Sequence, residues 1–243
     1  MGKREFKDRL FGEFAVIGKA LSSGHRLELL DLLAQGERSV EELAAEGGLS
    51  VANASAHLQV LRRARLVETE RRGTYVVYRL ADPAVFQLWR TLRDLGSARL
   101  AEVERLVDSY LGADRDLEAI DQERLLDLLE KDSVTLVDVR PVVEYRQGHI
   151  IRARSLPLEE IERRLRELPR RREVVAYCRG PYCVFADEAV DLLKRHGYRA
   201  RRLSGGFPDW RAAGLPVETG AQGPQGPRGP QGPQRAQEQE TGR

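Results

Sequence analysis

The stretch VVAYCRGPYCVFADEAV, residues 174–190, contains both cysteines of this 243-residue chain, Cys178 and Cys183. Its apolar beginning predicts a buried strand at 173–177, and residues 184–197 have helical spacing. The loop between this strand and helix can curl so that its backbone N–H groups point at the sulfur of Cys178, while the helix N-terminus adds positive potential. We therefore expect a lowered pKa for the Cys178 thiol and a stable persulfide anion on it.

Strands and helices alternate on both sides of this loop, over about residues 114–219. Residues 134–138 and 199–203 are further strand candidates, and residues 158–168 are a further helix candidate. Such alternation predicts an α/β domain in which helices cover a mainly parallel sheet.

The preceding part of the chain, about residues 1–113, has a mainly helical pattern. Residues 66–80 predict two strands joined by an Arg-Arg-Gly-Thr turn. The helix candidates are an apolar face over 6–21, a short helix over 25–36, a helix capped by Ser39 and Glu42, a third helix capped by Ser50 with Ala54, Leu58 and Leu61 facing inward, and a long amphipathic stretch over 83–111. This layout predicts a winged helix-turn-helix, whose reading helix fits the major groove of DNA.

The candidate DNA contacts follow from this layout. Asparagine and glutamine can each make a two-pronged contact to adenine, and arginines at the hairpin tip add affinity for the phosphate backbone. The candidates are Asn53, Ser55, His57, Gln59, Arg62, Arg63, Arg71 and Arg72.

Residues 15–85 resemble the ArsR/SmtB family of dimeric bacterial repressors. The best-matched pieces are LSVANASAHLQVLRRARLV (49–67) and GTYVVYRL (73–80). The resemblance implies a homodimer formed through the first and last helices of the domain, bound to an inverted repeat in double-stranded DNA.

The chain departs from the metal-sensing members of that family. Arg38 and Ser39 stand where those members carry a cysteine pair, and the stretch 83–111 contains no histidine. The four histidines have no ligand-like spacing. We therefore expect no metal and no cofactor.

Residues 117–219 resemble a single-domain rhodanese. The segments LVDVRPVVEYRQGHIIRARSLPL (136–158) and LSGGFPDWRAAGLPVE (203–218) match the first and last signatures of that family, and Cys178 stands at the position of its catalytic cysteine. The resemblance implies sulfur transfer from a small donor, thiosulfate or a persulfide, through an S-sulfanylated Cys178. The loop residues Arg179, Gly180, Pro181, Tyr182, Cys183 and Val184 would bind the donor, with Arg179 as the nearest cation.

Loop length argues against a phosphatase or arsenate reductase, which share the fold. Those enzymes have a loop one residue longer, with a histidine before the cysteine and an arginine six residues after it. Here Tyr177 precedes Cys178, and Val184 is the sixth residue on. The two-pronged arginine clamp for an oxyanion is therefore missing.

Two features of the loop leave alternatives open. Pro181 has no N–H, so the loop loses one donor. Cys183 is either a small buried residue or a resolving thiol that attacks the persulfide of Cys178 and forms a disulfide.

Other residues in the matched segments are given structural roles. Gly205 and Gly206 fit a backbone-conformation role, and Trp210 fits a core position. The charged residues near the end of the first strand predict a buried ion and hydrogen-bond network, namely Asp138, Arg140, Glu144 and His149.

Composition limits the remaining classes. The chain is 41% hydrophobic and 32% charged with a net charge of +2, so a core can form. Because it has no apolar run of membrane-spanning length, no secretion signal at its start and only two cysteines, we expect a soluble cytoplasmic protein. Residues 220–243 contain four Gly-Pro-Gln/Arg triplets in polar low-complexity sequence and are predicted to be disordered.

The sequence thus predicts two domains, a winged helix over 1–113 and a rhodanese domain over 114–219, with a tail over 220–243. The leading hypothesis is a transcriptional regulator, a repressor, that responds to reactive sulfur through a persulfide on Cys178. A second is a sulfurtransferase whose helix-turn-helix serves dimerisation or localisation. A third is a repressor whose rhodanese domain only adds stability.

Overall fold

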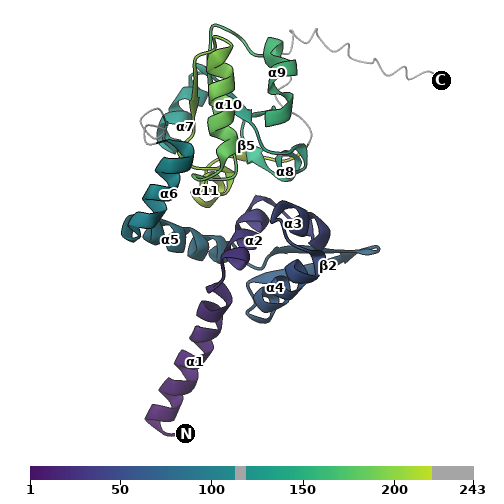
Figure 1. The fold of residues 1–243 in the computed structure, drawn as a ribbon, viewed down its shortest axis with the longest axis vertical. Helices are drawn as coiled ribbons and strands as arrows, with labels where there is room; N and C mark the ends of the chain where they lie inside the picture. The colour runs from purple at the N-terminus through teal and green to yellow at the C-terminus, as the bar shows by residue number, and fades with distance from the viewer. Residues whose placement is uncertain (113–118, 221–243) are drawn as a thin grey trace, which may run out of the picture.

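A computed structural model describes residues 1–112 and 119–220 (Figure 1). The predictions for most of the tail and for the start of the second domain therefore lie outside the described residues. The described residues form two modules, which we call the N-terminal module (residues 1–112) and the C-terminal module (residues 119–220).

The N-terminal module contains helices around a small antiparallel sheet with the strand order β1-β3-β2. Its elements are α1 (Lys3–Leu21), α2 (Gly24–Gln35), β1 (Arg38–Ser39), α3 (Val40–Glu46), α4 (Val51–Arg63), β2 (Val67–Arg72), β3 (Tyr75–Leu80), α5 (Pro83–Arg99) and α6 (Ala101–Leu111). The predicted winged helix is confirmed.

Local sequence signals set the ends of the central helices. Ser39 and Glu42 form a capping box at the start of α3, and the Ser50 side chain accepts a hydrogen bond from the Asn53 N–H at the start of α4. Ala54, Leu58 and Leu61 are fully buried, so the predicted inward stripe of α4 is confirmed. The stripe packs α4 against α2 and α3 in one apolar core.

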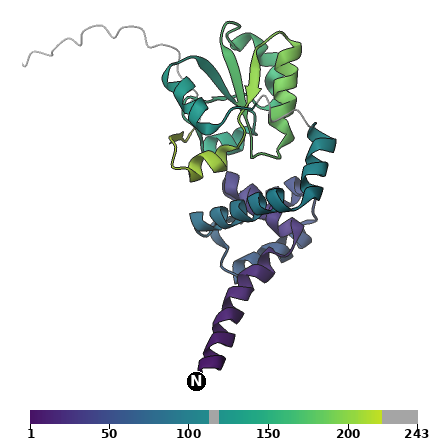
Figure 2. The same cartoon turned by 90° about the vertical axis from the view of Figure 1, so that its left-hand side faces the viewer.

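The stretch 83–111 was predicted to form one long amphipathic helix, and the structure differs from this prediction. It forms two helices, α5 and α6, because Leu100 between them has extended backbone (φ −106°, ψ 99°). Gly96 in the last turn of α5 weakens the helix, and Ser97 shares a hydrogen bond with Tyr182 of the other module. The change of direction lets α6 run beside the C-terminal module (Figure 2).

The C-terminal module is built on a four-stranded parallel sheet with the order β6-β4-β7-β8. Strands β5 and β9 form a separate antiparallel pair. The elements are α7 (Gln122–Glu130), β4 (Val134–Asp138), α8 (Val142–Gln147), β5 (His149–Ile150), β6 (Arg154–Ser155), η1 (Leu158–Glu160), α9 (Ile161–Arg164), η2 (Leu165–Glu167), β7 (Glu173–Tyr177), α10 (Val184–Arg195), β8 (Ala200–Arg202), α11 (Phe207–Ala212) and β9 (Val217–Glu218). The α/β prediction is confirmed.

Alternate residues of the central strands pack into two apolar layers. Leu136 and Val175 face a cluster with α7 and α11, whereas Val137 and Val174 face a cluster with α9 and α10. The predicted helix over 158–168 is in fact split into η1, α9 and η2, because its ends tighten into i→i+3 turns.

The two modules are stacked, and α1 extends away from both (Figures 1 and 2). Helix α11 of the C-terminal module packs against α2 and α5. The loop that joins β7 to α10, residues 178–183, contacts the same side of the N-terminal module, so the cysteine loop lies at the boundary between the modules.

Candidate functional site

The cysteine loop is curled, as the sequence predicts. The Cys183 N–H donates to the Gly180 carbonyl at 3.2 Å, and the Cys178 carbonyl accepts from the Phe207 N–H at 3.1 Å. Gly206 passes so close to the loop that a Cβ there would lie 2.4 Å from the backbone of Arg179 and Gly180. The backbone-conformation role predicted for Gly205 and Gly206 is not what requires glycine here, because neither residue has a positive φ. Gly206 is instead required by this close approach.

The Cys178 thiol is buried, with 1% of the residue exposed, at the end of β7. Its S–H donates to the carbonyls of Gly180 and Cys183 at 3.7 and 3.5 Å. Burial raises the pKa of Cys178 well above the ordinary value, and hydrogen bonds from the backbone of Gly180 and Ala186 oppose this only in part. The expectation of a lowered pKa at Cys178 is therefore wrong, because desolvation outweighs the loop dipoles.

Cys183 has the opposite character, although it belongs to the same loop. It is the residue before α10 and is only partly buried. A hydrogen bond with Cys178 lowers its pKa to about 7, burial opposes this, and backbone hydrogen bonds from Arg179 and Phe185 add to the lowering. The loop thus divides its N–H groups between two sulfur atoms and favours negative charge on Cys183.

A cavity of about 540 Å³ separates the loop from the N-terminal module. Residues of α2, α3 and α5 form one wall, and the loop with the start of α10 forms the other. The lining residues are Gly24, Leu27, Glu28, Asp31, Leu32, Glu46, Trp89 and Arg93 on the first wall, and Arg179, Gly180, Pro181, Tyr182, Cys183, Val184 and Phe185 on the second. The cavity brings every predicted loop residue except Cys178 to one surface.

Arg179 connects the loop to both modules. Its guanidinium pairs with Glu144 of α8 at 2.5 Å and with Glu46 of α3 at 2.7 Å. Its predicted role as the cation for an anionic donor stays a prediction, and such a donor would compete with these two carboxylates for the guanidinium.

The buried network predicted around the first strand is present and extends across the boundary. Asp138, Arg140, Glu144 and His149 are all buried. Arg140 donates to Asp138 at 2.6 Å, and Glu144 pairs with Arg38 of the N-terminal module. Further contacts between the modules join Gln35 with Arg179 and Arg140, Glu37 with Gln147, Ala34 with Arg211, Gln87 with Ala212, Arg93 with Asp209, and Ser97 with Tyr182.

The partners from the N-terminal module could not be predicted from the sequence. Arg38 and Glu144 are 106 positions apart, and each has an ordinary sequence context. No local pattern links two such residues, since their proximity arises only when the modules pack.

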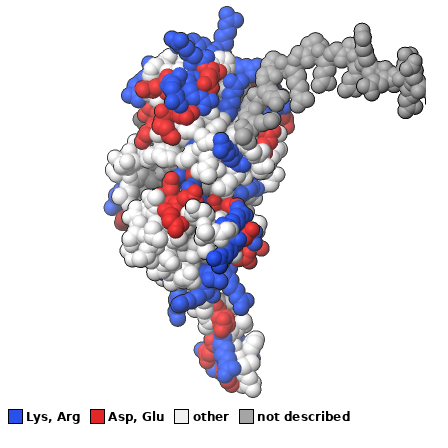
Figure 3. All heavy atoms as spheres, turned by 90° about the vertical axis from the view of Figure 1, so that its right-hand side faces the viewer, with Lys and Arg blue, Asp and Glu red and all other residues white. Residues whose placement is uncertain are grey.

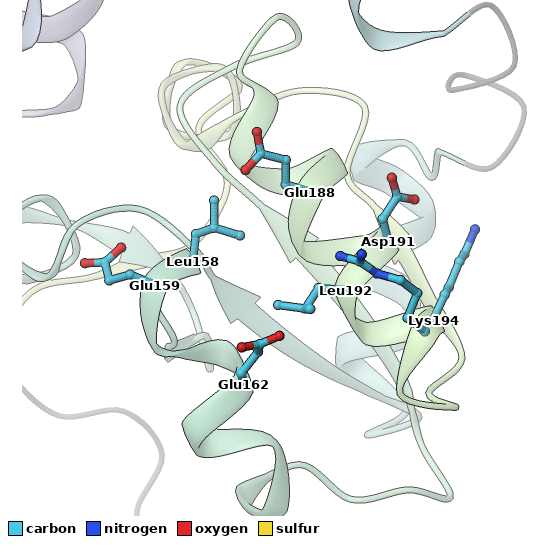
Figure 4. Close-up of a pocket in the computed structure, with 8 residues that line it drawn as sticks. Leu158, Glu159, Glu162, Glu188, Asp191, Leu192 and Lys194 are labelled. Carbon is cyan, nitrogen blue, oxygen red and sulfur yellow. The ribbon is translucent and has the colours of Figure 1, made fainter.

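A larger hollow of about 740 Å³ lies elsewhere, between η1, α9 and α10. Figure 4 shows Glu188 and Asp191 of α10 across it from Glu159 and Glu162. Because it contains mainly charged surface side chains and no cysteine, we do not regard it as the functional site.

The candidate DNA contacts lie on α4 and at the β2–β3 tip. Ser55, His57 and Gln59 are partly buried, whereas the rest are exposed, namely Asn53, Arg62, Arg63, Arg71 and Arg72. The His57 ring lies beside His25 of α2, with 5.5 Å between ring centroids. Burial, followed by the charges of Arg26 and His25, lowers the pKa of His57, so its neutral form is favoured.

Two of the hairpin arginines have acidic partners, whereas Arg71 donates to the Gly73 carbonyl at 3.3 Å. Arg72 pairs with Glu37 and Glu70, and Arg79 pairs with Glu68 at 2.8 Å. On this side of the molecule, basic and acidic side chains lie next to one another (Figure 3). Phosphate binding to Arg72 would therefore replace existing ion pairs.

The fold and the site define a class of protein, a winged-helix regulator with an appended cysteine-loop domain. Residues 23–69 match the family described as bacterial regulatory protein, arsR family, and residues 121–213 match the rhodanese-like domain. An HTH-type transcriptional regulator, Rv0324 of Mycobacterium tuberculosis, is 44% identical over 220 residues, which cover 90% of this chain and 96% of the relative. The chain belongs to this family of ArsR-type transcriptional regulators that carry a rhodanese-like domain.

Two further similarities cover one module each. A sulfurtransferase of Allochromatium vinosum is 39% identical over 100 residues, or 40% of this chain and 92% of the relative. The homodimeric winged helix-turn-helix domain of Mb0332 from Mycobacterium bovis is 42% identical, with a TM-score of 0.39 over 41% of this chain and 93% of that chain.

Two kinds of feature are missing from the described residues. None of their helices is long and apolar enough to cross a membrane. Within residues 1–112 and 119–220, no group of three or more His, Cys, Asp or Glu side chains is arranged to hold a metal ion.

Proposed function

We propose that this regulator responds to reactive sulfur and that Cys178 carries the signal as a persulfide. The observation that supports this most directly is the position of the cysteine loop, which forms one wall of a cavity whose other wall is the DNA-binding module. A change at the loop therefore acts directly on that module.

Arg179 offers a physical path for the response. It follows Cys178 in the chain and pairs with Glu46 at the end of α3, which packs against α4. A new negative charge on the loop sulfur competes with Glu46 for this guanidinium. A typical coupling of about 1–3 kcal/mol would change DNA affinity about 5- to 150-fold.

We further propose that the protein is a homodimeric repressor that binds an inverted repeat in double-stranded DNA, with the cytoplasm as its location. The exposed apolar side chains of α1 support self-association, because Phe11 and Phe14 are more than half exposed in a single chain. Phe14→Glu is expected to give a monomer in light scattering, whereas Glu13→Gln should leave the dimer intact.

The test is a binding titration on DNA from the protein's own promoter, with and without prior treatment by a persulfide. Wild type should change its affinity at least about fivefold, the lower end of typical coupling. The double variant Cys178→Ser, Cys183→Ser, which has no thiol in the loop, should not respond. Equal DNA affinity of treated and untreated wild type would contradict the proposal. It would favour the hypothesis of a repressor whose rhodanese domain only adds stability.

A second candidate function is sulfur transfer with turnover, with thiosulfate or a persulfide as the donor. The similarity to a sulfurtransferase favours it. Burial of Cys178 and its raised pKa argue against rapid turnover. A thiosulfate:cyanide assay distinguishes the two functions. If the protein is a sulfurtransferase, the wild type should turn over in this assay and Cys178→Ser should be inactive.

A further inference from the structure

The two cysteines have different access to the cavity between the modules. Cys183 lines it, whereas Cys178 does not. Cys178 belongs to the apolar cluster beneath the sheet, and Cys183 packs on the edge of that cluster. A molecule that enters the cavity therefore meets the sulfur of Cys183 first.

The surroundings of Cys183 suit an attacking thiol. The two thiols share a hydrogen bond, and the N–H groups of Arg179 and Phe185 stabilise a negative charge on Cys183. The position before α10 adds the favourable potential of a twelve-residue helix.

The lining of the cavity indicates the class of donor. Both arginines in it are held by carboxylates, Arg93 by Asp209 and Asp94, and Arg179 by Glu46 and Glu144. Three carboxyl groups also line it, from Glu28, Asp31 and Glu46. Burial raises the pKa of Asp31, so its carboxyl adds less negative charge than the other two. A small dianion such as thiosulfate would have to displace the carboxylates that already pair with Arg93 and Arg179.

Apolar side chains supply much of the remaining wall. Leu27, Leu32 and Trp89 face the loop residues Tyr182 and Phe185 across the cavity. A volume of about 540 Å³ has room for a molecule of amino-acid or peptide size. The Trp89 indole N–H donates to Asp31 at 2.8 Å, which fixes a carboxyl group that can accept a hydrogen bond from an ammonium. Burial raises the pKa of this carboxyl, and the hydrogen bond from Trp89 opposes the shift.

We propose that this cavity binds an organic persulfide and that Cys183 first accepts its outer sulfur and then passes it to Cys178. This rests on the proposed function, in which Cys178 is the final carrier. This proposal assigns part of the donor site to the N-terminal module, which contributes Leu27, Asp31 and Trp89 to the cavity.

Both steps are redox-neutral exchanges. The Cys183 thiolate attacks the outer sulfur of R–S–SH; the S–S bond of the donor breaks, a new S–S bond forms on Cys183, and the leaving thiolate R–S⁻ takes up a proton. The Cys178 sulfur then attacks the outer sulfur on Cys183. The S–S bond to Cys183 breaks, and the leaving Cys183 sulfur takes up the proton of Cys178. This forms Cys178–S–SH and regenerates the Cys183 thiol.

The first experiment follows loading by intact-mass spectrometry in the full chain after rapid mixing with cysteine persulfide. Wild type should gain one sulfur atom, which peptide mapping should place on Cys178. Cys178→Ser should also gain one sulfur, retained on Cys183. Cys183→Ser should load Cys178 at least about tenfold more slowly, because the accessible thiolate is absent.

Loading of Cys178 in Cys183→Ser at the wild-type rate would overturn the relay, as would failure of Cys178→Ser to gain sulfur. Circular dichroism and thermal unfolding of both variants establish that they are folded. The relay can fail while persulfide on Cys178 still alters DNA affinity, so its failure is distinguishable from that of the proposed function.

The second experiment tests the cavity. Leu27→Trp fills it from the N-terminal module at a position that is only partly buried, and Glu188→Trp is the matched control in the other hollow. Leu27→Trp should slow loading by cysteine persulfide at least about fivefold, whereas the control should not. Wild type should load faster from cysteine persulfide than from thiosulfate. A wild-type rate in Leu27→Trp, or faster loading from thiosulfate, would overturn the assignment of the donor site.

Discussion

The boundary between the modules and the hairpin tip both contain arginines paired with carboxylates, in opposite surroundings. Arg140 and Arg38 at the boundary are 0% and 5% exposed, whereas the side chains of Arg72 and Arg79 on the hairpin are 50% and 55% exposed. Buried charges must keep their partners, since an unpaired one is strongly destabilising. Exposed pairs contribute little and are easily exchanged. The same residue type therefore fixes the structure in one region and remains available to a ligand in the other.

Removal of a boundary arginine should give the largest effect. Arg140→Ala leaves the buried Asp138 without its guanidinium partner and removes a hydrogen bond to the Gly148 carbonyl. We expect the free energy of unfolding to fall by about 3–5 kcal/mol in urea denaturation. A loss below about 1 kcal/mol would mean that the buried network contributes no more to stability than an exposed ion pair does.

Displacement of the cysteine loop should have a smaller effect on stability. Gly206→Ala places a Cβ 2.4 Å from the backbone of Arg179 and Gly180, so the loop must shift. We expect a loss of about 1–3 kcal/mol by thermal denaturation, with slower sulfur loading. Gly205→Ala is the matched control, because the nearest atoms to its Cβ are side-chain atoms, of Asp209 at 3.3 Å and of Gln122 at 3.6 Å. Equal effects of both variants would show that the close approach at Gly206 is unimportant.

The ionisation of the loop can be measured by alkylation of Cys183 against pH. Its thiolate forms as pH rises through the pKa of about 7, so the alkylation rate should increase roughly tenfold from pH 6 to pH 8 and then level off. Cys178 should stay unreactive in this range, because burial raises its pKa. Cys178→Ser keeps a donor to Cys183 and should hold the midpoint near 7, whereas Cys178→Ala should raise it. A rate that still climbs steeply above pH 8 in wild type would refute the low pKa of Cys183.

The hairpin should give the smallest change in stability. Arg72→Ala should alter the free energy of unfolding by no more than about 0.5 kcal/mol. If the tip contacts phosphate as proposed, the salt dependence of DNA binding should decrease by about one unit of log–log slope. Arg201→Ala, which removes another partly exposed pair, with Glu173, is the control and should leave DNA binding unchanged. An unchanged slope in Arg72→Ala would remove this arginine from the DNA interface.

Much of the fold could be predicted because its signals are local. The capping box at Ser39, the cap at Ser50 and the buried stripe of α4 are set by neighbours three or four residues apart. The strand segments around Cys178 are short apolar runs whose alternation with helices predicts a parallel sheet. The break at Leu100 was missed because it accompanies a contact with Tyr182, which is distant in the sequence.

The candidate site could be predicted only in part. Both cysteines and their curled loop follow from the sequence, but the cavity opposite them does not, because its other wall comes from α2, α3 and α5. The pairing of Arg179 with Glu46 likewise depends on the packing of the modules.

The sequence by itself determined two modules, their order, and one loop that holds every thiol of the chain. Only the tertiary structure decided which thiol is buried, which one faces the cavity and where Arg179 directs its charge. The physical reason is that secondary structure depends on residues close along the chain, whereas the pKa of a thiol and the strength of an ion pair depend on all the groups that packing brings around them.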